Sequence, residues 1–209
     1  PITRVGDALV GTCDALGVIA SDVVLLARPE IAELREGAVA GRGGSSTMPH
    51  KNNPVFCAAI LATATRMPGL VSTMFAAMAQ EHERALGGWQ AEWETLPEIF
   101  TLSAGALFHM RQIIDGIEVF PARMRANLDL GSGLIMAEAV MLELGRTIGR
   151  QHAHDVVYDA AQAAFVEGKP FGQLLAADPR VAAHLDARAI EALLDPTAYT
   201  GLCADLARE

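Results

Sequence analysis

The residues with the clearest chemical potential lie in one short stretch, Gly41 to Pro54, which reads Gly-Arg-Gly-Gly-Ser-Ser-Thr-Met-Pro-His-Lys-Asn-Asn-Pro. Its glycines permit left-handed backbone conformations and a close approach to a ligand. Lys51 adds a cation, Asn53 is placed to cap a following helix, and Pro54 suits the first helical position. Because the N-terminus of a helix attracts anions, the stretch predicts an anion-binding loop.

Two common phosphate-binding loops do not fit this stretch. The sequence lacks the Gly-Lys-Ser/Thr of a Walker loop, and it lacks the buried strand and second glycine triplet of a dinucleotide fingerprint. The order Gly-Ser-Ser-x-Met-Pro-x-Lys-x-Asn instead resembles the signature of the fumarase/aspartase superfamily. The matching residues are Gly44, Ser45, Ser46, Met48, Pro49, Lys51 and Asn53.

That resemblance implies a fold and an assembly. Members of the superfamily are all-α, with a long-helix bundle domain that joins other subunits in a homotetramer core, followed by a small helical C-terminal domain. Each active site combines segments from three subunits, and the signature loop is one of them. The other two, a Thr-Ser segment and a His segment, precede it in the family and have no match here. We therefore expect the carboxy-terminal part of a longer enzyme, inactive alone.

Two departures narrow the choice within the superfamily. Ala58 stands where the ordinary lyases carry a glutamate, and Trp89 and Trp93 stand in the region where adenylosuccinate lyases hold a nucleotide phosphate. The signature and the stretches 80–97 and 124–130 look instead like the 3-carboxy-cis,cis-muconate cycloisomerase family. This resemblance covers most of the chain.

The cycloisomerase resemblance implies a reaction without cofactor or metal, in the cytoplasmic breakdown of protocatechuate (the β-ketoadipate pathway). A carboxylate of a small dicarboxylate or tricarboxylate substrate adds across a carbon–carbon double bond and closes a lactone. Negative charge grows on a second carboxylate, which fixed donors and a cation stabilise. Two alternatives stay open: another superfamily lyase similar to adenylosuccinate lyase, and an inactive helical assembly module.

The resemblance also assigns substrate-binding residues. Lys51 and Asn53 would hold the carboxylate on which charge develops, and Thr47 and Met48 belong to the same loop and contact the substrate. Arg84 is a further candidate carboxylate ligand, with a surface ion pair to a neighbouring glutamate as the alternative.

Two serines are the candidate catalytic residues. Ser45 aligns with the proton-transfer group of the superfamily, and Ser46 is its neighbour. A free serine hydroxyl is too weak an acid to act as a base at neutral pH, so Ser45 requires nearby positive charge and loop donors.

Three long helices are predicted to position this loop. Apolar residues recur every three or four positions over 2–27 and over 89–117, whereas 55–78 is almost continuously apolar. Arg66 and Pro68 interrupt the last segment, which favours a helix buried in a bundle over a membrane span. The seam of 89–117, with both tryptophans as core residues, is predicted to be Trp89, Trp93, Leu96, Phe100, Ser103, Leu107, Met110, Ile114 and Ile117.

The sequence changes character near residue 119. Shorter helices are predicted over 121–129, 134–150 and 152–167, separated by glycine and proline. We place a domain boundary here, between 1–119 and 120–209. Because no segment alternates convincingly with period two, the predicted fold is all-α.

Composition excludes several classes of protein. A formal charge of −9 argues against a nucleic-acid partner. The three cysteines, Cys13, Cys57 and Cys203, show no metal-ligand spacing and fit a reducing cytoplasm. Cys57 lies in an apolar segment and is expected to be a core residue rather than a nucleophile.

Overall fold

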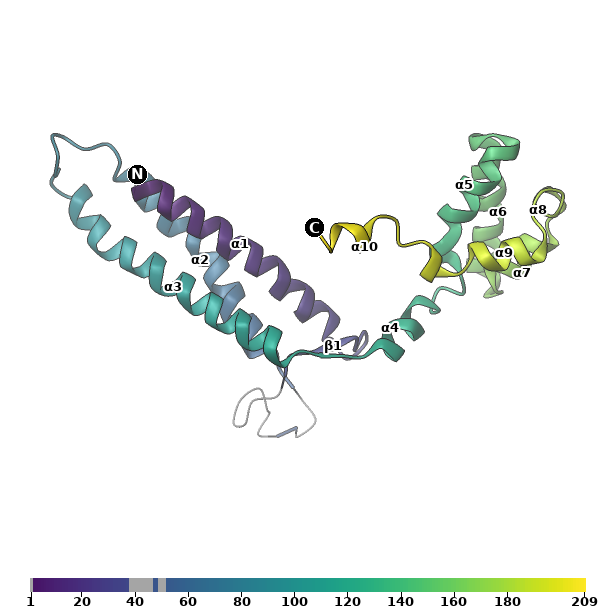
Figure 1. Ribbon diagram of the computed structural model, residues 1–209, viewed down its shortest axis with the longest axis horizontal. Helices are drawn as coiled ribbons and strands as arrows, with labels where there is room; N and C mark the ends of the chain where they lie inside the picture. The colour runs from purple at the N-terminus through teal and green to yellow at the C-terminus, as the bar shows by residue number, and fades with distance from the viewer. Residues whose placement is uncertain (1, 38–46, 49–51) are drawn as a thin grey trace. The chain divides into compact units, whose positions relative to one another are not determined.

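The computed structural model describes residues 2–37, 47–48 and 52–209. Contacts divide the chain into two compact units, Pro1–Arg123 and Met124–Glu209. Helices make up nearly all of the regular structure in the part of the chain that is described (Figure 1), so the predicted all-α fold is confirmed. The predicted domains, 1–119 and 120–209, stay a prediction; the division by contacts falls at residue 123.

The first unit is built on three long helices. These are α1 (Ile2–Leu26), α2 (Val55–Ala76) and α3 (Gly88–Gly116), which pack along one another (Figure 1). Each contributes residues at steps of about three and four to one core, and for α1 these are residues of the predicted apolar stripe. The buried residues of this core are Cys13, Leu16, Ala20, Val23, Phe56, Cys57, Ile60, Met67, Val71, Met74, Ile99, Ala106, Met110 and Ile113.

Two short strands lie in segments for which no secondary structure was predicted. β1 (Leu34–Arg35) pairs antiparallel with β2 (Glu118–Val119), with Leu34 opposite Val119. Arg35 also forms an ion pair with Glu118 across the two strands. Two-residue strands are too short for a period-two pattern, which explains why they were not predicted. The pair ties the segment after α1 to the segment after α3.

Only part of the predicted seam of α3 packs on α1 and α2 within this chain. Of its residues only Ser103 and Met110 are fully buried, whereas the side that packs on α1 and α2 also includes Thr95, Ile99, Ala106 and Ile113. The exposed apolar stripe of α3 consists of Trp93, Phe100, Leu107 and Ile114, which are 57%, 49%, 48% and 59% exposed.

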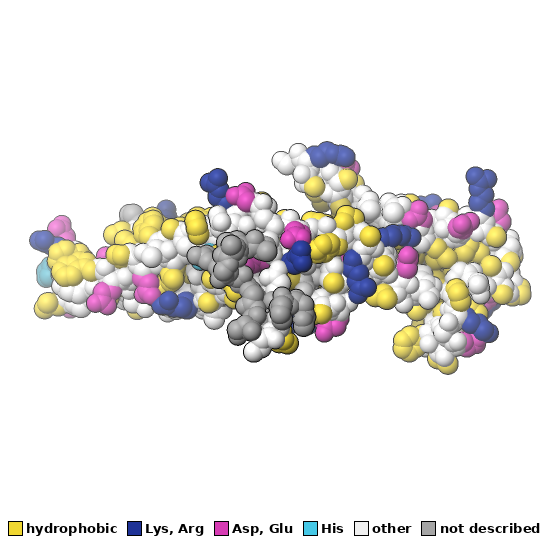
Figure 2. Space-filling model, turned by 90° about the horizontal axis from the view of Figure 1, so that it is seen from below, with side chains coloured by type: hydrophobic (Ala, Val, Ile, Leu, Met, Phe, Trp, Pro, Cys, Tyr) yellow, Lys and Arg dark blue, Asp and Glu magenta, His cyan; other side chains and the backbone are white. Residues whose placement is uncertain are grey.

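This exposed stripe follows a strict seven-residue spacing, so its members lie on one face of the helix. The helix therefore has two apolar faces, and the sequence pattern did not separate them. Apolar side chains reach the surface of the long-helix unit among charged ones (Figure 2). Trp93, expected in the core, is a surface residue of the chain as it stands.

The second unit consists of short helices around its own core. Its elements after α4 (Pro121–Leu128) are η1 (Leu134–Met136), α5 (Ala137–Ile148), α6 (Arg150–Glu167), α7 (Phe171–Ala177), α8 (Pro179–Ala182), α9 (Ala187–Leu193), η2 (Pro196–Ala198) and α10 (Cys203–Leu206). The predicted helices over 134–150 and 152–167 are thus confirmed to within a few residues. Gly149 and Gly168 have φ of 84° and 66°, which suits glycine and ends α5 and α6.

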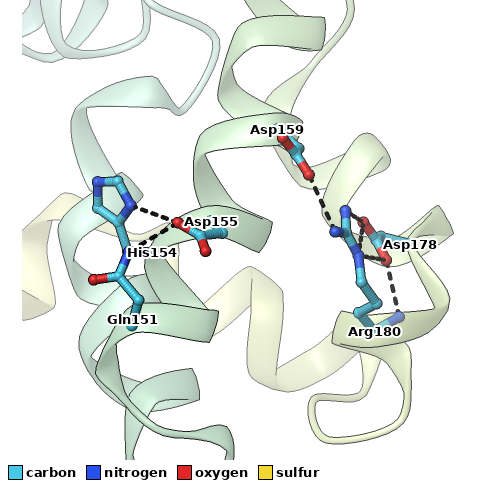
Figure 3. A network of polar contacts seen from close by, with 6 residues as sticks. All are labelled: Gln151, His154, Asp155, Asp159, Asp178 and Arg180. Carbon is cyan, nitrogen blue, oxygen red and sulfur yellow. Dashed lines mark hydrogen bonds and ion pairs between the residues drawn. The ribbon is translucent and has the colours of Figure 1, made fainter.

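An ion-pair network links α6 to α8 and to the residue between α7 and α8 (Figure 3). Arg180 donates to both carboxylate oxygens of Asp178, with 2.7 Å from Nη2 to Oδ2, and its Nη1 lies 3.1 Å from Asp159 on α6. Asp178 also caps α8, because its Oδ1 accepts the backbone N–H of Arg180 at 2.8 Å. The Arg180 hydrogen bond lowers the pKa of the Asp178 carboxyl.

Among the residues that the structure describes, two helices, α1 and α2, have the length and hydropathy of a membrane span. In the first unit both contribute a face to the helical core. Arg66, in the middle of α2, forms an ion pair with Glu98 of α3. These contacts agree with the interpretation of α2 as a helix of a bundle.

Candidate functional site

The described part of the signature stretch borders a cavity of the first unit. Met48, Asn52, Asn53 and Pro54 line this space of about 640 Å³. Arg28 and Arg35 contribute cationic side chains to its walls, and Phe120 an aromatic ring. The guanidinium of Arg35 lies over the Phe120 ring, 5.6 Å from its centroid. Glu36 also lines this space, so the lining contains both basic and acidic residues.

The N-terminus of α2 is not capped as the sequence predicts. Asn53 is not the N-cap, because the helix begins at Val55 and its N-cap position is Pro54, without a side-chain cap. The carboxylate of Glu36 occupies this end instead: it accepts the N–H of Phe56 at 2.9 Å and the N–H of Cys57 at 3.1 Å. The local sequence pattern predicted the wrong capping residue, because the carboxylate that binds these N–H groups comes from Glu36, 20 positions before Phe56.

This arrangement corrects the predicted anion site. The first-turn N–H groups of α2 do attract a carboxylate, but that carboxylate belongs to Glu36. Glu36 is only 4% exposed. An anion in the cavity would therefore have to be held by other groups, such as the basic residues of its wall.

Cys57 is confirmed as a core residue. Its side chain is fully buried, and it is a free thiol. Burial, together with the hydrogen bond and negative charge of Glu36, raises the pKa of the Cys57 thiol to about 12. A thiol that stays protonated at neutral pH is a poor nucleophile.

Arg84 lies far from this cavity within one chain. It follows the C-terminal end of α2, and the 22 residues of that helix span about 33 Å at 1.5 Å per residue. Its guanidinium lies over the Trp89 ring, 5.4 Å from the centroid. Within the described segments, the alternative ion pair with Glu81 or Glu83 is not formed. Arg84 as a substrate ligand stays a prediction.

The remaining predicted site residues are placed only in part. Ser45, Ser46 and Lys51 lie outside the described residues, while Thr47 is exposed. Glu36 was missed because its segment, 31–37, has no periodicity. Across residues 2–37, 47–48 and 52–209 no group of three or more His, Cys, Asp or Glu side chains is arranged to hold a metal.

Comparison with known proteins gives a consistent set of relatives. The family described as Lyase matches residues 2–69, and Adenylosuccinate lyase C-terminus matches residues 133–209. The chain is 50% identical over 202 residues to 3-carboxy-cis,cis-muconate cycloisomerase of Pseudomonas aeruginosa, covering 93% of this chain and 44% of the relative. It is 41% identical over 206 residues to nitrosuccinate lyase of Streptomyces davaonensis, covering 99% and 44%.

Solved structures agree with these relatives. The crystal structure of 3-carboxy-cis,cis-muconate lactonizing enzyme from Pseudomonas putida superimposes with a TM-score of 0.85 at 43% identity, over 96% of this chain and 44% of that one. The chain thus spans about half the length of the curated relatives that it matches.

Proposed function

Since this chain belongs to the fumarase/aspartase superfamily, we propose that it supplies the carboxy-terminal part of a 3-carboxy-cis,cis-muconate cycloisomerase. The observation that carries this proposal is 50% identity to the Pseudomonas aeruginosa cycloisomerase over 93% of the chain. The reaction would convert 3-carboxy-cis,cis-muconate to 4-carboxymuconolactone in protocatechuate degradation. It needs only proton transfer and charge stabilisation, and no cofactor.

The proposed chemistry closes a ring by addition. A carboxylate oxygen of the substrate forms a bond to one carbon of a double bond, and the electron pair moves toward the neighbouring carbon and its carboxylate. A proton then adds to that carbon. Lys51 and Asn53 would hold the carboxylate that gains charge, and Thr47 and Met48 would contact the substrate. Ser45, next to Ser46, would transfer the proton.

The cavity beside Asn53 supports an anionic substrate. Its lining combines Arg28, Arg35 and Glu36 with a largely apolar wall, and Glu36 is already bonded to the N–H groups of α2. Arg35 is already paired with Glu118, so its charge is partly compensated. Arg28 is the cation of this wall without an ion pair in the described part of the chain. A carboxylate entering the cavity would gain most from Arg28.

We infer that the full protein is a homotetramer. The exposed apolar stripe of α3 supports this, because a long helix with two apolar faces requires a partner for each. Arg84, about one helix length from Asn53, would then serve the active site of another subunit. The three free cysteines, Cys13, Cys57 and Cys203, fit a cytoplasmic location.

A chimera tests this function. The chain would be joined to the amino-terminal part of the Pseudomonas aeruginosa relative, which supplies the half that this chain does not span. We expect the chimera to consume 3-carboxy-cis,cis-muconate, seen as loss of its ultraviolet absorbance, and the chain alone to be inactive. Turnover of adenylosuccinate in place of the muconate would favour the alternative lyase.

A further inference from the structure

Glu36 is a buried carboxylate with a defined set of partners. Placing a charge inside a protein is costly unless hydrogen bonds and opposite charge compensate it. Here each carboxylate oxygen accepts one backbone N–H of the first turn of α2, at 2.9 Å and 3.1 Å. The positive end of the helix dipole adds further stabilisation. Phe56, one of the two donors, also stacks on His109 of α3, with 5.3 Å between ring centroids.

The backbone around Glu36 is held as well. Its carbonyl oxygen accepts the side-chain amide of Asn52 at 3.2 Å. The next residue, Gly37, lies directly against Gly116, because a Cβ at Gly37 would come within 2.1 Å of the Gly116 carbonyl oxygen. The β1–β2 pair fixes the residues just before it. One short segment therefore contacts α2, α3 and the residue preceding Asn53.

We propose that Glu36 is a positioning residue for the lactone-forming site. Glu36 lies just before the signature stretch and bonds to residues at its end, Asn52, Phe56 and Cys57. It thereby holds Asn52 and Asn53 at the cavity. Its negative charge also fills the N-terminus of α2, so that the substrate carboxylate is left to the cations of the site. This inference rests on the proposed function.

The role predicts a local effect when the carboxylate is removed. In Glu36→Ala the N–H groups of Phe56 and Cys57 lose their acceptor, and the start of α2 loosens. Cys57 lies at that start, whereas Cys13 lies in the middle of α1 and is 1% exposed. Thiol labelling thus separates local from global opening: local release exposes Cys57 alone, and global unfolding exposes both.

The first experiment uses the chain itself. Native protein is labelled with a thiol reagent at pH 8, and mass spectrometry assigns the modified cysteine. We expect Glu36→Ala to raise the labelling rate of Cys57 at least about tenfold relative to Cys13, and Glu36→Asp to restore part of the protection. The matched control is Glu98→Gln, which removes an exposed partner of Arg66 and should leave the ratio of the Cys57 and Cys13 labelling rates unchanged. Equal increases at Cys13 and Cys57 would overturn the proposal.

The second experiment measures turnover in the active chimera. We expect Glu36→Gln, which keeps the shape of the side chain and removes its charge, to lower kcat at least about tenfold while KM changes less, and Glu98→Gln to leave both unchanged. Local release of Cys57 with an unaltered kcat would contradict a positioning role. An inactive wild-type chimera would count against the proposed function instead. The ratio of the Cys57 and Cys13 labelling rates then decides by itself whether Glu36 holds this segment.

Discussion

The backbone N–H of Cys57 donates to the carboxylate of Glu36 over 3.1 Å, within the first turn of α2. The two residues are 21 positions apart, and the signature stretch lies between them. The bond makes the protein's own carboxylate the anion at this helix end. It also places a negative charge beside a buried thiol, which has a measurable consequence.

Stability should fall in alkaline solution through Cys57. The pKa of this thiol rises from 9.0 to about 12 on folding, so between these values the unfolded chain has lost the proton that the native state keeps. The free energy of unfolding therefore decreases as pH rises from 9 toward 12. Urea denaturation of the wild type and Cys57→Ala at pH 8 and pH 10.5 measures this effect. A wild-type loss no larger than that of Cys57→Ala would contradict it.

Gly37 should not tolerate a side chain. A Cβ there would lie 2.1 Å from a backbone oxygen of Gly116, so Gly37→Ala forces the backbone to move. We expect a loss of about 1–3 kcal/mol in the free energy of unfolding. Gly11→Ala is the matched comparison, because Gly11 lies inside α1 with open space at its Cβ. It should stabilise the chain by about 0.5–1 kcal/mol. Thermal unfolding should show a lower melting temperature for Gly37→Ala and a higher one for Gly11→Ala than for the wild type.

The ion pair between Asp178 and Arg180 should stabilise the protein in addition to the helix cap that Asp178 provides for α8. Asp178 and Asp186 both cap short helices through a backbone N–H, but only Asp178 also pairs with Arg180. Asp186→Ala should lower the free energy of unfolding by about 1 kcal/mol. Asp178→Ala should lower it by up to about 1 kcal/mol more, a small increment because the ion pairs are partly exposed. Denaturant unfolding of the two variants gives the difference, and equal losses would show that Arg180 adds nothing.

The same pair has a defined pH dependence. Because Arg180 lowers the pKa of Asp178 below its ordinary 3.8, the added stability is present above that pH and is lost as pH falls through the lower native value. The difference between the wild type and Asp178→Ala should therefore shrink in acid below about pH 4. A difference that stays constant from pH 6 to pH 2 would contradict this assignment.

The exposed apolar stripe of α3 should carry subunit contacts. Phe100→Glu and Leu107→Glu place a charge on that face, so we expect each to lower the molar mass measured by light scattering. Phe165→Glu on α6 is the control, since Phe165 is 78% exposed and belongs to the second unit. A monomeric wild type, or an assembly indifferent to all three changes, would argue against the tetramer.

The sequence predicts the helices well because their signals are local. Apolar steps of three and four predict α1 and α3, and Gly168 ends α6 as expected, whereas α5 ends at Gly149, inside the predicted helix 134–150. The cap of α8 is equally local, because Asp178 directly precedes Pro179 and accepts the N–H of Arg180.

The site is predicted less completely because it depends on residues distant in sequence. Glu36 caps α2 from 20 positions away, and β1 pairs with β2 across more than 80 residues. The two faces of α3 are a further example. That Thr95 is buried and Trp93 exposed depends on how α1 and α2 pack against the helix. Local pattern finds the elements, whereas the packing between them decides which face is buried.

The central claim is that the signature stretch stabilises a substrate carboxylate during ring closure. The most direct test compares wild-type and Lys51→Met chimeras in the conversion of 3-carboxy-cis,cis-muconate to its lactone, at matched oligomeric state. Loss of a fixed cation that faces the developing charge should lower kcat about 100-fold or more. An assembled Lys51→Met chimera that forms lactone at the wild-type rate would contradict the claim.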